Sequence, residues 1–217
     1  VEGGEFHDLE TFWHFAPELT VTKSENVFMA VRSQVAGESP MRLGLLPVEC
    51  SGWSAELCSG YVSSAYGRKD SAAIARCSAR AQLPAEHAVL LHAVSVSNRF
   101  GKFTHESALN NGATAYRYDE SGKSHFMIFA NLDKETWTCR GWTSDARFLY
   151  CCFDEGRLTH FILCEGRFAH SENNPLLAHN RKMEWFEWQI REGLPRIFSS
   201  DDRAQNSWSC NEKEWSY

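Results

Sequence analysis

Short runs of alternating apolar and polar residues, separated by turn-forming residues, recur along most of the chain. Alternation with a period of two is typical of β-strands that bury one face. The first half predicts strands at Phe6–Phe15, Leu19–Thr22, Val27–Arg32, Met41–Val48, Ser54–Ser59, Ile74–Arg80 and Ala88–Val96. The second half predicts strands at Thr114–Tyr118, His125–Ala130, Phe148–Phe153, Leu158–Leu163 and Met183–Ile190.

The turns between these runs indicate antiparallel pairing. A polar segment that contains Gly joins two apolar runs at Asp119–Lys123 and again at Asp154–Arg157, and this arrangement predicts a β-hairpin. Ala72–Ala81 is rich in Ala and Arg, which favours a helix by propensity, but its neighbours are strands and we predict a strand there too. The pattern as a whole predicts an all-β fold, an antiparallel β-sandwich with little helix.

No linker long enough to separate two domains interrupts this pattern. We therefore expect one β-sandwich domain over residues 1–171, with residues 172–217 as a C-terminal segment that supplies closing strands of the same domain. Within that segment, Phe198–Asp202 is expected to form a loop. Ser207–Tyr217 is expected to be a closing strand or a partly disordered tail.

The composition is that of an ordinary globular protein and argues against two classes of partner. The chain has 217 residues, of which 43% are hydrophobic and 23% are charged, enough to bury a core. A formal net charge of −6 disfavours a uniformly basic nucleic-acid-binding protein, and no apolar run is long enough for a membrane-spanning helix. The opening Val-Glu-Gly-Gly has neither an initiator Met nor a signal-peptide segment, so we expect a mature chain or part of a longer protein.

The cysteines predict free thiols more strongly than disulfides or a zinc site. The eight are Cys50, Cys58, Cys77, Cys139, Cys151, Cys152, Cys164 and Cys210. The CxxC spacing of zinc sites is absent, and the adjacent pair Cys151 and Cys152 would point to opposite faces of a strand. A chain of this length can form a core without disulfides, so we expect mostly free, buried thiols. Free thiols favour a reducing compartment, but the localisation itself is not defined by the sequence.

The common catalytic motifs are absent. The sequence has no GxSxG, no HExxH and no GxxxxGK[ST] phosphate loop. His7 and His14 are separated by an odd number of residues on one predicted strand, so they point to opposite faces and cannot share a metal ion. His125 and His160 each lie in a predicted hairpin strand, and their pairing is not defined by the sequence. We therefore predict no metal site, no cofactor and no identifiable catalytic set.

Tryptophan is the most promising residue type for ligand contacts. The chain contains eight Trp residues, and a flat indole can pack against the C–H face of a sugar, although Trp is usually well buried in a sandwich core. Trp185 and Trp188 are an odd number of residues apart. On a strand one of them would point inward and the other outward, and the outward one is a candidate for edge packing or ligand contact.

Four segments follow one another in an order that is informative. They are the strand Gly4–Pro17 (GEFHDLETFWHFAP), the loop Gly60–Gly67 (GYVSSAYG), the entry Ala81–Pro84 (AQLP) into Ala88–Leu91, and the pair Ser144–Tyr150 and Gly156–Phe161. The loop has the pattern Ser, two residues, Tyr, Gly. In this order the segments resemble the C-terminal β-region of heparinase II/III-like polysaccharide lyases, over about residues 4–170.

The resemblance implies a supersandwich-like β-region, which in this family follows an N-terminal helical domain. Family members cleave uronate-containing glycans by β-elimination: a base removes the proton beside the uronate carboxylate, and a Tyr/His pair transfers protons. In the family, these residues and the structural zinc ligands lie mostly upstream of the matched region. The resemblance therefore places no catalytic or metal-binding residue on this chain. The partners it implies are an acidic polysaccharide or oligosaccharide and the helical domain of a parent chain.

Several functional hypotheses stay open at this point. The leading one is the C-terminal β-sandwich portion of such a lyase, which supports the catalytic domain and is inactive alone. The alternatives are a free-standing carbohydrate-binding module, a structural domain without its own ligand, and a complete small lyase that would need His, Tyr and Arg in one groove. Whether the chain is itself an enzyme is left open. Trp13, Tyr66 and Trp142 are the predicted substrate contacts, because they lie on or beside the matched segments.

Overall fold

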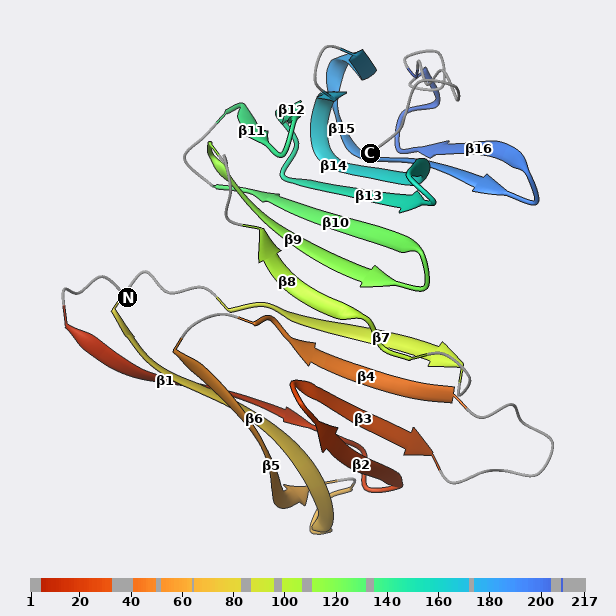
Figure 1. The fold of residues 1–217 in the computed structure, drawn as a ribbon. Coiled ribbons are helices and arrows are strands. Elements are labelled where there is room, and N and C mark those ends of the chain that lie inside the picture. Colours follow the sequence, from red (N-terminus) through yellow and green to blue (C-terminus); the bar gives the residue numbers. More distant parts are fainter. Residues whose placement is uncertain are drawn as a thin grey trace. The chain divides into compact units, whose positions relative to one another are not determined.

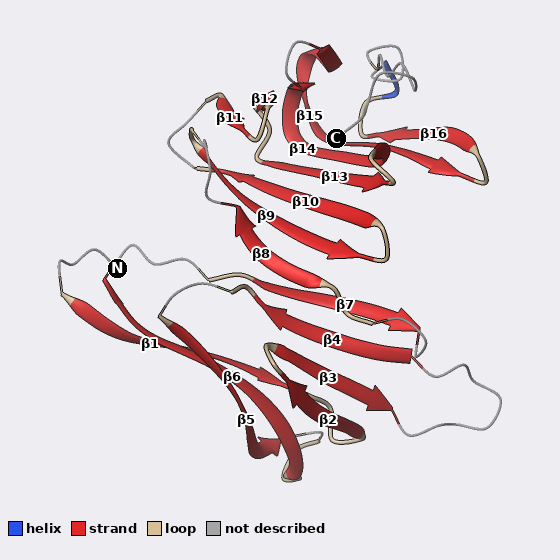
Figure 2. Cartoon of the chain, in the orientation of Figure 1, coloured by secondary structure: helices blue, strands red, loops and turns tan. Residues whose placement is uncertain are grey.

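The computed structural model consists almost entirely of β-strands (Figures 1 and 2). It describes residues 5–32, 41–49, 52–63, 65–82, 87–95, 99–106, 111–131, 135–171, 174–203 and 208. Strands account for 77% of these residues, and helix is limited to a short turn at 202–203. The prediction of an all-β sandwich fold with little helix is confirmed. No helix in the described ranges is long and apolar enough to cross a membrane.

The chain forms two compact units, residues 1–104 and 105–217. The first unit contains two antiparallel sheets. One has the order β1–β6–β5, with β1 at Phe6–His14, β6 at Asp70–Gln82 and β5 at Trp53–Val62. The other has the order β2–β3–β4–β7, with β2 at Leu19–Ser24, β3 at Val27–Arg32, β4 at Met41–Pro47 and β7 at Val89–Ser95. A buried cluster of Phe15, Phe28, Ala30, Leu45 and Ala75 joins the two sheets.

Strand β6 contains the Ala- and Arg-rich segment whose composition favours a helix. It is hydrogen-bonded to β1 on one side and to β5 on the other along most of its length. Ala75 and Cys77 are fully buried on the core side, while Arg76 points to the other face. Pairing on both sides and burial of small side chains on one face outweigh a helix preference that is worth only fractions of a kcal/mol per residue.

The second unit is built on one nine-stranded antiparallel sheet. Its main order is β11–β12–β14–β13–β10–β9–β8, with β15 paired to β14 and β16 paired to β15. The bounds are β8 Lys102–Glu106, β9 Ala113–Glu120, β10 Lys123–Ala130, β11 Trp137–Cys139, β12 Trp142–Ser144, β13 Phe148–Asp154, β14 Arg157–Ser171, β15 Asn174–Arg191 and β16 Leu194–Ser199. The predicted hairpin of β13 and β14 therefore lies in the interior of the sheet.

The turn of this hairpin has the geometry that its sequence predicts. Glu155 and Gly156 both have positive φ angles, 49° and 80°, and Ser121 and Gly122 between β9 and β10 have similar values, 45° and 83°. Two consecutive residues with positive φ form a type I′ turn, whose twist matches that of paired strands. Gly suits the second position because it has no Cβ to clash in the left-handed region.

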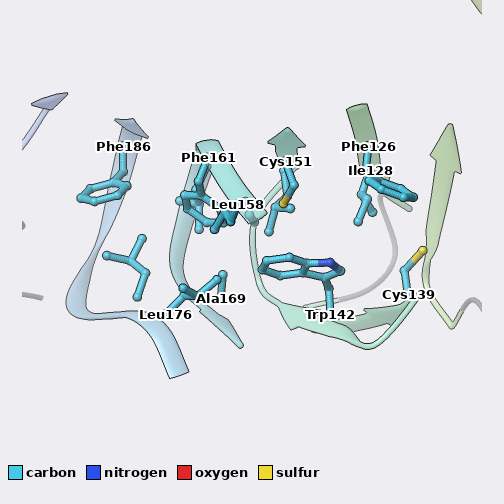
Figure 3. Close-up of a cluster of buried hydrophobic side chains, with 14 of the residues drawn as sticks. Phe126, Ile128, Cys139, Trp142, Cys151, Leu158, Phe161, Ala169, Leu176 and Phe186 are labelled. Carbon is cyan, nitrogen blue, oxygen red and sulfur yellow. The ribbon is translucent and has the colours of Figure 1, made fainter. Parts of the chain in front are cut away.

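One face of the second sheet carries the larger core of the molecule. The side chains in this core include Phe126, Ile128, Leu149, Cys151, Phe161, Leu163, Phe186 and Trp188, and Figure 3 shows many of them around Trp142. In the β13–β14 hairpin, Cys152, Phe161 and Leu163 are buried, while Phe148 and Tyr150 are only half-buried. Leu149, Cys151 and Phe153 point into the core, whereas Phe148, Tyr150 and Cys152 point to the opposite face, where Cys152 is also covered.

The C-terminal segment differs from its prediction in one element. Phe198, expected in a loop, lies in β16, which pairs with β15 from Phe186↔Ser199 to Arg191↔Leu194. The expected division near residue 171 falls inside the second unit, where β14 and β15 are paired. Of the predicted final segment 207–217, only Trp208 is within the described residues; its ring lies 5.1 Å from Phe161 and 5.3 Å from Trp188, between centroids.

Six cysteines of the described chain are free thiols, and their burial leads to a prediction. They are Cys58, Cys77, Cys139, Cys151, Cys152 and Cys164. Burial raises the pKa of the Cys139 thiol to about 11 and that of Cys151 well above its ordinary value, so little reactive thiolate forms in the folded chain. We expect titration of the denatured, unreduced chain to find at least six thiols, and the folded chain to react much more slowly. Two or fewer thiols after denaturation would contradict this.

Candidate functional site

The three predicted substrate contacts do not form one site. Trp13 is 41% exposed on β1, and Tyr66 is fully exposed on the loop between β5 and β6. Trp142 lies in the second unit and is only 2% exposed, because its indole fills the core beside Phe161, with 6.1 Å between ring centroids (Figure 3). In this position Trp142 offers no ring face to a sugar, so it is a packing residue in the structure.

A row of polar side chains crosses the opposite, outer face of the second sheet. Cross-strand pairing places Tyr118 beside His125, His125 beside Cys152, Cys152 beside His160, and His160 beside Gln189. These five residues come from five adjacent strands, β9, β10, β13, β14 and β15. We call them the polar row. Four of the five have a sequence neighbour in the apolar core, namely Phe126, Cys151, Phe161 and Trp188, so strand alternation turns the row to the opposite face.

Hydrogen bonds connect the polar row to Tyr150 and Glu120 on the same face. The Tyr150 hydroxyl lies 2.8 Å from Nδ1 of His125, and the Tyr118 hydroxyl donates to Oε2 of Glu120 at 2.9 Å. Oε1 of Glu120 is 3.9 Å from Nε2 of His125. Four side chains from three strands are thereby gathered into one Tyr–His–Glu–Tyr network.

The environment of this network determines where its protons reside. Burial, with smaller effects from neighbours such as Cys152, raises the pKa of Tyr150 well above its ordinary value, so its hydroxyl stays protonated. A protonated Tyr150 can donate to Nδ1 of His125, which leaves the ring proton on Nε2, the nitrogen that faces the Glu120 carboxylate. The contacts of its two nitrogens with Tyr150 and Glu120 hold the imidazole in one orientation.

A second His–carboxylate contact lies further along the same face. Nε2 of His160 is 2.9 Å from Oε1 of Glu187, and the ring of Tyr150 meets the His160 ring edge-on at 5.2 Å. The pairing of β13 and β14 shifts between Cys152 and Phe153, so β14 has one extra residue here, Thr159. Such a β-bulge changes the direction of neighbouring side chains, and bulges are frequent beside functional sites.

Aromatic rings occupy the part of the outer face next to this network. They are Tyr116, Phe129, Phe148, Trp185 and Phe198. Phe129 packs against Phe148 at 5.0 Å and edge-on against Tyr116 at 6.0 Å, between ring centroids. Phe129, Trp185 and Phe198 are each more than a third exposed. The parity prediction for Trp185 and Trp188 is confirmed, since Trp188 is buried at 2% and Trp185 is exposed at 40%.

Tyr118, Cys152 and Gln189 are at most 8% exposed, so the accessible part of this outer face is formed by His160, Glu187 and the exposed rings. That part can bind a ligand that has both hydroxyl groups and apolar faces. Imidazoles, phenols and carboxylates donate or accept hydrogen bonds to hydroxyl groups, and the exposed rings provide flat apolar contact. Within the described residues, no group of three or more His, Cys, Asp or Glu side chains is placed to hold a metal ion.

Reasoning on single strands could not find this network. The sequence showed His125 and His160 in separate hairpins, and only the pairing with β13 brings both beside Cys152. One signal was present: a two-residue turn at Ser121-Gly122 sets Tyr118 opposite His125. The contact with Tyr150 depends on the pairing of β10 with β13, which are joined by no short turn.

Comparison with known proteins adds no relative to this picture: neither a protein-family model nor a curated protein matches the chain.

Proposed function

We propose that this chain is the C-terminal β-region of a heparinase II/III-like polysaccharide lyase, and that it contacts uronate-containing glycan through the outer face of its second sheet. The observation that carries the proposal is the combination of the Tyr–His–Glu–Tyr network with exposed rings on one continuous face. The all-β architecture and the order of the resembling segments along the chain are in agreement with it.

The rings and the network would serve different parts of a sugar. A pyranose presents C–H groups on its faces and hydroxyl groups around its rim. Trp185 and Phe129 have exposed surface for the faces, and His160 with Glu187 can bind hydroxyl groups at the rim. Arg196 on β16 is exposed and pairs with Gln189 of the polar row. Its guanidinium is the group that would bind a uronate carboxylate in this proposal.

The same network argues for a supporting role and against lyase activity by the chain alone. β-Elimination requires a base, a proton donor and a positive group that stabilises the substrate carboxylate. His125 and His160 both face carboxylates, those of Glu120 and Glu187. A uronate carboxylate bound at either imidazole would be repelled by these two side chains. The catalytic set is therefore expected from another part of the parent protein.

Binding of the intact chain to heparin, chondroitin and alginate oligosaccharides tests the contact surface. We expect Arg196→Ala to weaken binding of at least one of these glycans about tenfold, since a charge-assisted hydrogen bond is worth about 1.5–3 kcal/mol. Arg32→Ala, at an exposed Arg at the end of β3, is the control with the same change of charge and should have little effect. Calorimetric titration measures both. Equal losses in the two variants would show only a general effect of charge.

An activity assay tests the supporting role. We expect no ultraviolet absorbance from unsaturated uronate when the chain is incubated with the three glycans, with or without zinc. The coding region upstream is expected to encode a predominantly helical domain. Turnover above background that disappears in His125→Ala or Tyr150→Phe would overturn the supporting role and favour a complete small lyase. Turnover lost on replacing His7, His14 or Tyr66 would do the same.

A free-standing carbohydrate-binding module is the second candidate. The exposed Trp185, Phe129 and Phe198 favour it, because such modules need only a ring-lined face. Glycan binding by the chain, with an upstream region that encodes no helical domain, would support this alternative over the lyase β-region.

A further inference from the structure

A cavity of about 380 Å³ in the first unit is not used by the function proposed above. This volume is within the roughly 300–1,000 Å³ typical of small-molecule sites. Its lining includes Trp53 at the start of β5, Cys77 on β6, and His87 just before β7. The backbone N–H of Val48 donates to the carbonyl of Ala88 at 2.8 Å. This hydrogen bond holds the end of β4 beside the start of β7.

Two rings form one wall of the cavity. The indole of Trp53 and the imidazole of His87 are stacked, with 4.0 Å between centroids and 15° between planes. Nε2 of His87 is buried and has no hydrogen-bond partner in the described part of the chain. Buried polar atoms nearly always have a partner, so an unsatisfied ring nitrogen in a cavity wall indicates that something else completes it.

The polar groups of the lining are close to neutral overall. Asn26 and Ser54 contribute an amide and a hydroxyl, and Glu49 is the one acidic side chain among the described lining residues. Oε2 of Glu49 is 3.2 Å from Nζ of Lys102, so its charge is already compensated. Burial lowers the pKa of His87, which keeps this imidazole uncharged at neutral pH. Among the described lining residues, a charged ligand therefore meets no unpaired charge of the opposite sign.

We propose that this cavity, named here the Trp53–His87 cavity, binds an uncharged, hydroxyl-rich ligand of the size of a mono- or disaccharide. The stacked rings provide the apolar wall, and Asn26, Ser54 and His87 provide hydrogen bonds to hydroxyl groups. The cavity lies in the first unit, whereas the outer face discussed above belongs to the second unit. The cavity is proposed to bind uncharged ligands, and the outer face is proposed to bind acidic glycans. Binding in the cavity does not depend on the function proposed for that face.

Calorimetric titration and saturation-transfer NMR with cellobiose, maltose, lactose, glucuronic acid and glucosamine test the proposal. We expect saturable binding of at least one neutral disaccharide, with the two charged sugars at least about tenfold weaker. Trp53→Ala should reduce the affinity at least about tenfold, because it removes the ring wall. His87→Gln should reduce it several-fold, since it keeps a hydrogen-bonding group and loses the stacked ring.

Control variants separate binding from folding. Phe12→Ala removes an exposed ring from the opposite face of the same sheet and should leave the affinity unchanged. Each variant's thermal midpoint is measured, and if Trp53→Ala is unfolded, Trp53→Phe replaces it, with an expected loss of a few-fold. Absence of binding across the panel, equal binding in Trp53→Ala or Trp53→Phe, or tighter binding of either charged sugar would each overturn the proposal. Because glycan binding at Arg196 is assayed with acidic polymers, either proposal can fail without the other.

Discussion

Phe161→Ala is expected to lower the free energy of unfolding by about 3–5 kcal/mol. Phe161 is fully buried on β14, in the interior of the nine-stranded sheet. Its ring contacts three others, Trp142, Phe186 and Trp208, at centroid distances of 6.1, 6.3 and 5.1 Å. Removing the ring leaves a cavity that the surrounding packing cannot fill, because Trp142 and Phe186 are held on β12 and β15, which both pair with β14.

Urea unfolding of the wild type and the variant measures this change. Phe129→Ala is the matched control, since Phe129 is 46% exposed on the outer face of the same sheet. The control is expected to lose less than about 1 kcal/mol. A loss under about 1 kcal/mol for Phe161→Ala would mean that β14 is loosely packed or that its inner face is not buried.

The Trp142→Ala variant is expected to lose a similar amount, about 3–5 kcal/mol, without losing glycan affinity in the folded fraction. Trp142 is 2% exposed and packs among core residues, including Cys151 and Phe161 (Figure 3). Its indole cannot reach a sugar while it fills the core. Trp185→Ala is expected to show the reverse, little change in stability and weaker glycan binding, because Trp185 is on the exposed outer face.

Unfolding curves and glycan titrations on both Trp variants distinguish the two roles. Because both variants remove the same side chain, the comparison isolates its position. Weaker glycan binding by a folded Trp142→Ala chain, at unchanged stability, would restore Trp142 as the substrate contact that the sequence suggested. Unchanged binding by Trp185→Ala would remove Trp185 from the proposed contact surface.

Strand positions and hairpin turns were the part of the fold that could be predicted. The β13–β14 hairpin follows from two apolar runs around Asp154–Arg157, and it lies in the sheet interior. Strand β16 was missed because Leu194–Ser199 shows little alternation. Leu194–Ser199 forms a strand because it is hydrogen-bonded to β15. The two-unit division at 104 and 105 was also not predicted, since no linker marks it.

The candidate site could be predicted only in fragments. The within-strand parity of Trp185 and Trp188 followed directly from their spacing, and the structure bears it out. The contact between His125 and Tyr150 depends on two strands that are not joined by a short turn. The burial of Trp142 could not be predicted for a related reason, because an apolar ring in a short strand can face either side of a sheet.

By itself, the sequence determined the all-β fold class, the turn at Glu155-Gly156 and the alternation that separates a core face from an outer face. These properties are local, because they depend only on residues that are close in sequence. They follow from backbone sterics, from the left-handed conformation of the turn and from the two-residue period of a strand. Only the tertiary structure decided which strands are paired and in which register, and therefore that Tyr118, His125, Cys152 and His160 form one row. The physical reason is that sheet hydrogen bonds join distant segments, and a shift of one residue, such as the bulge at Thr159, changes which side chains meet.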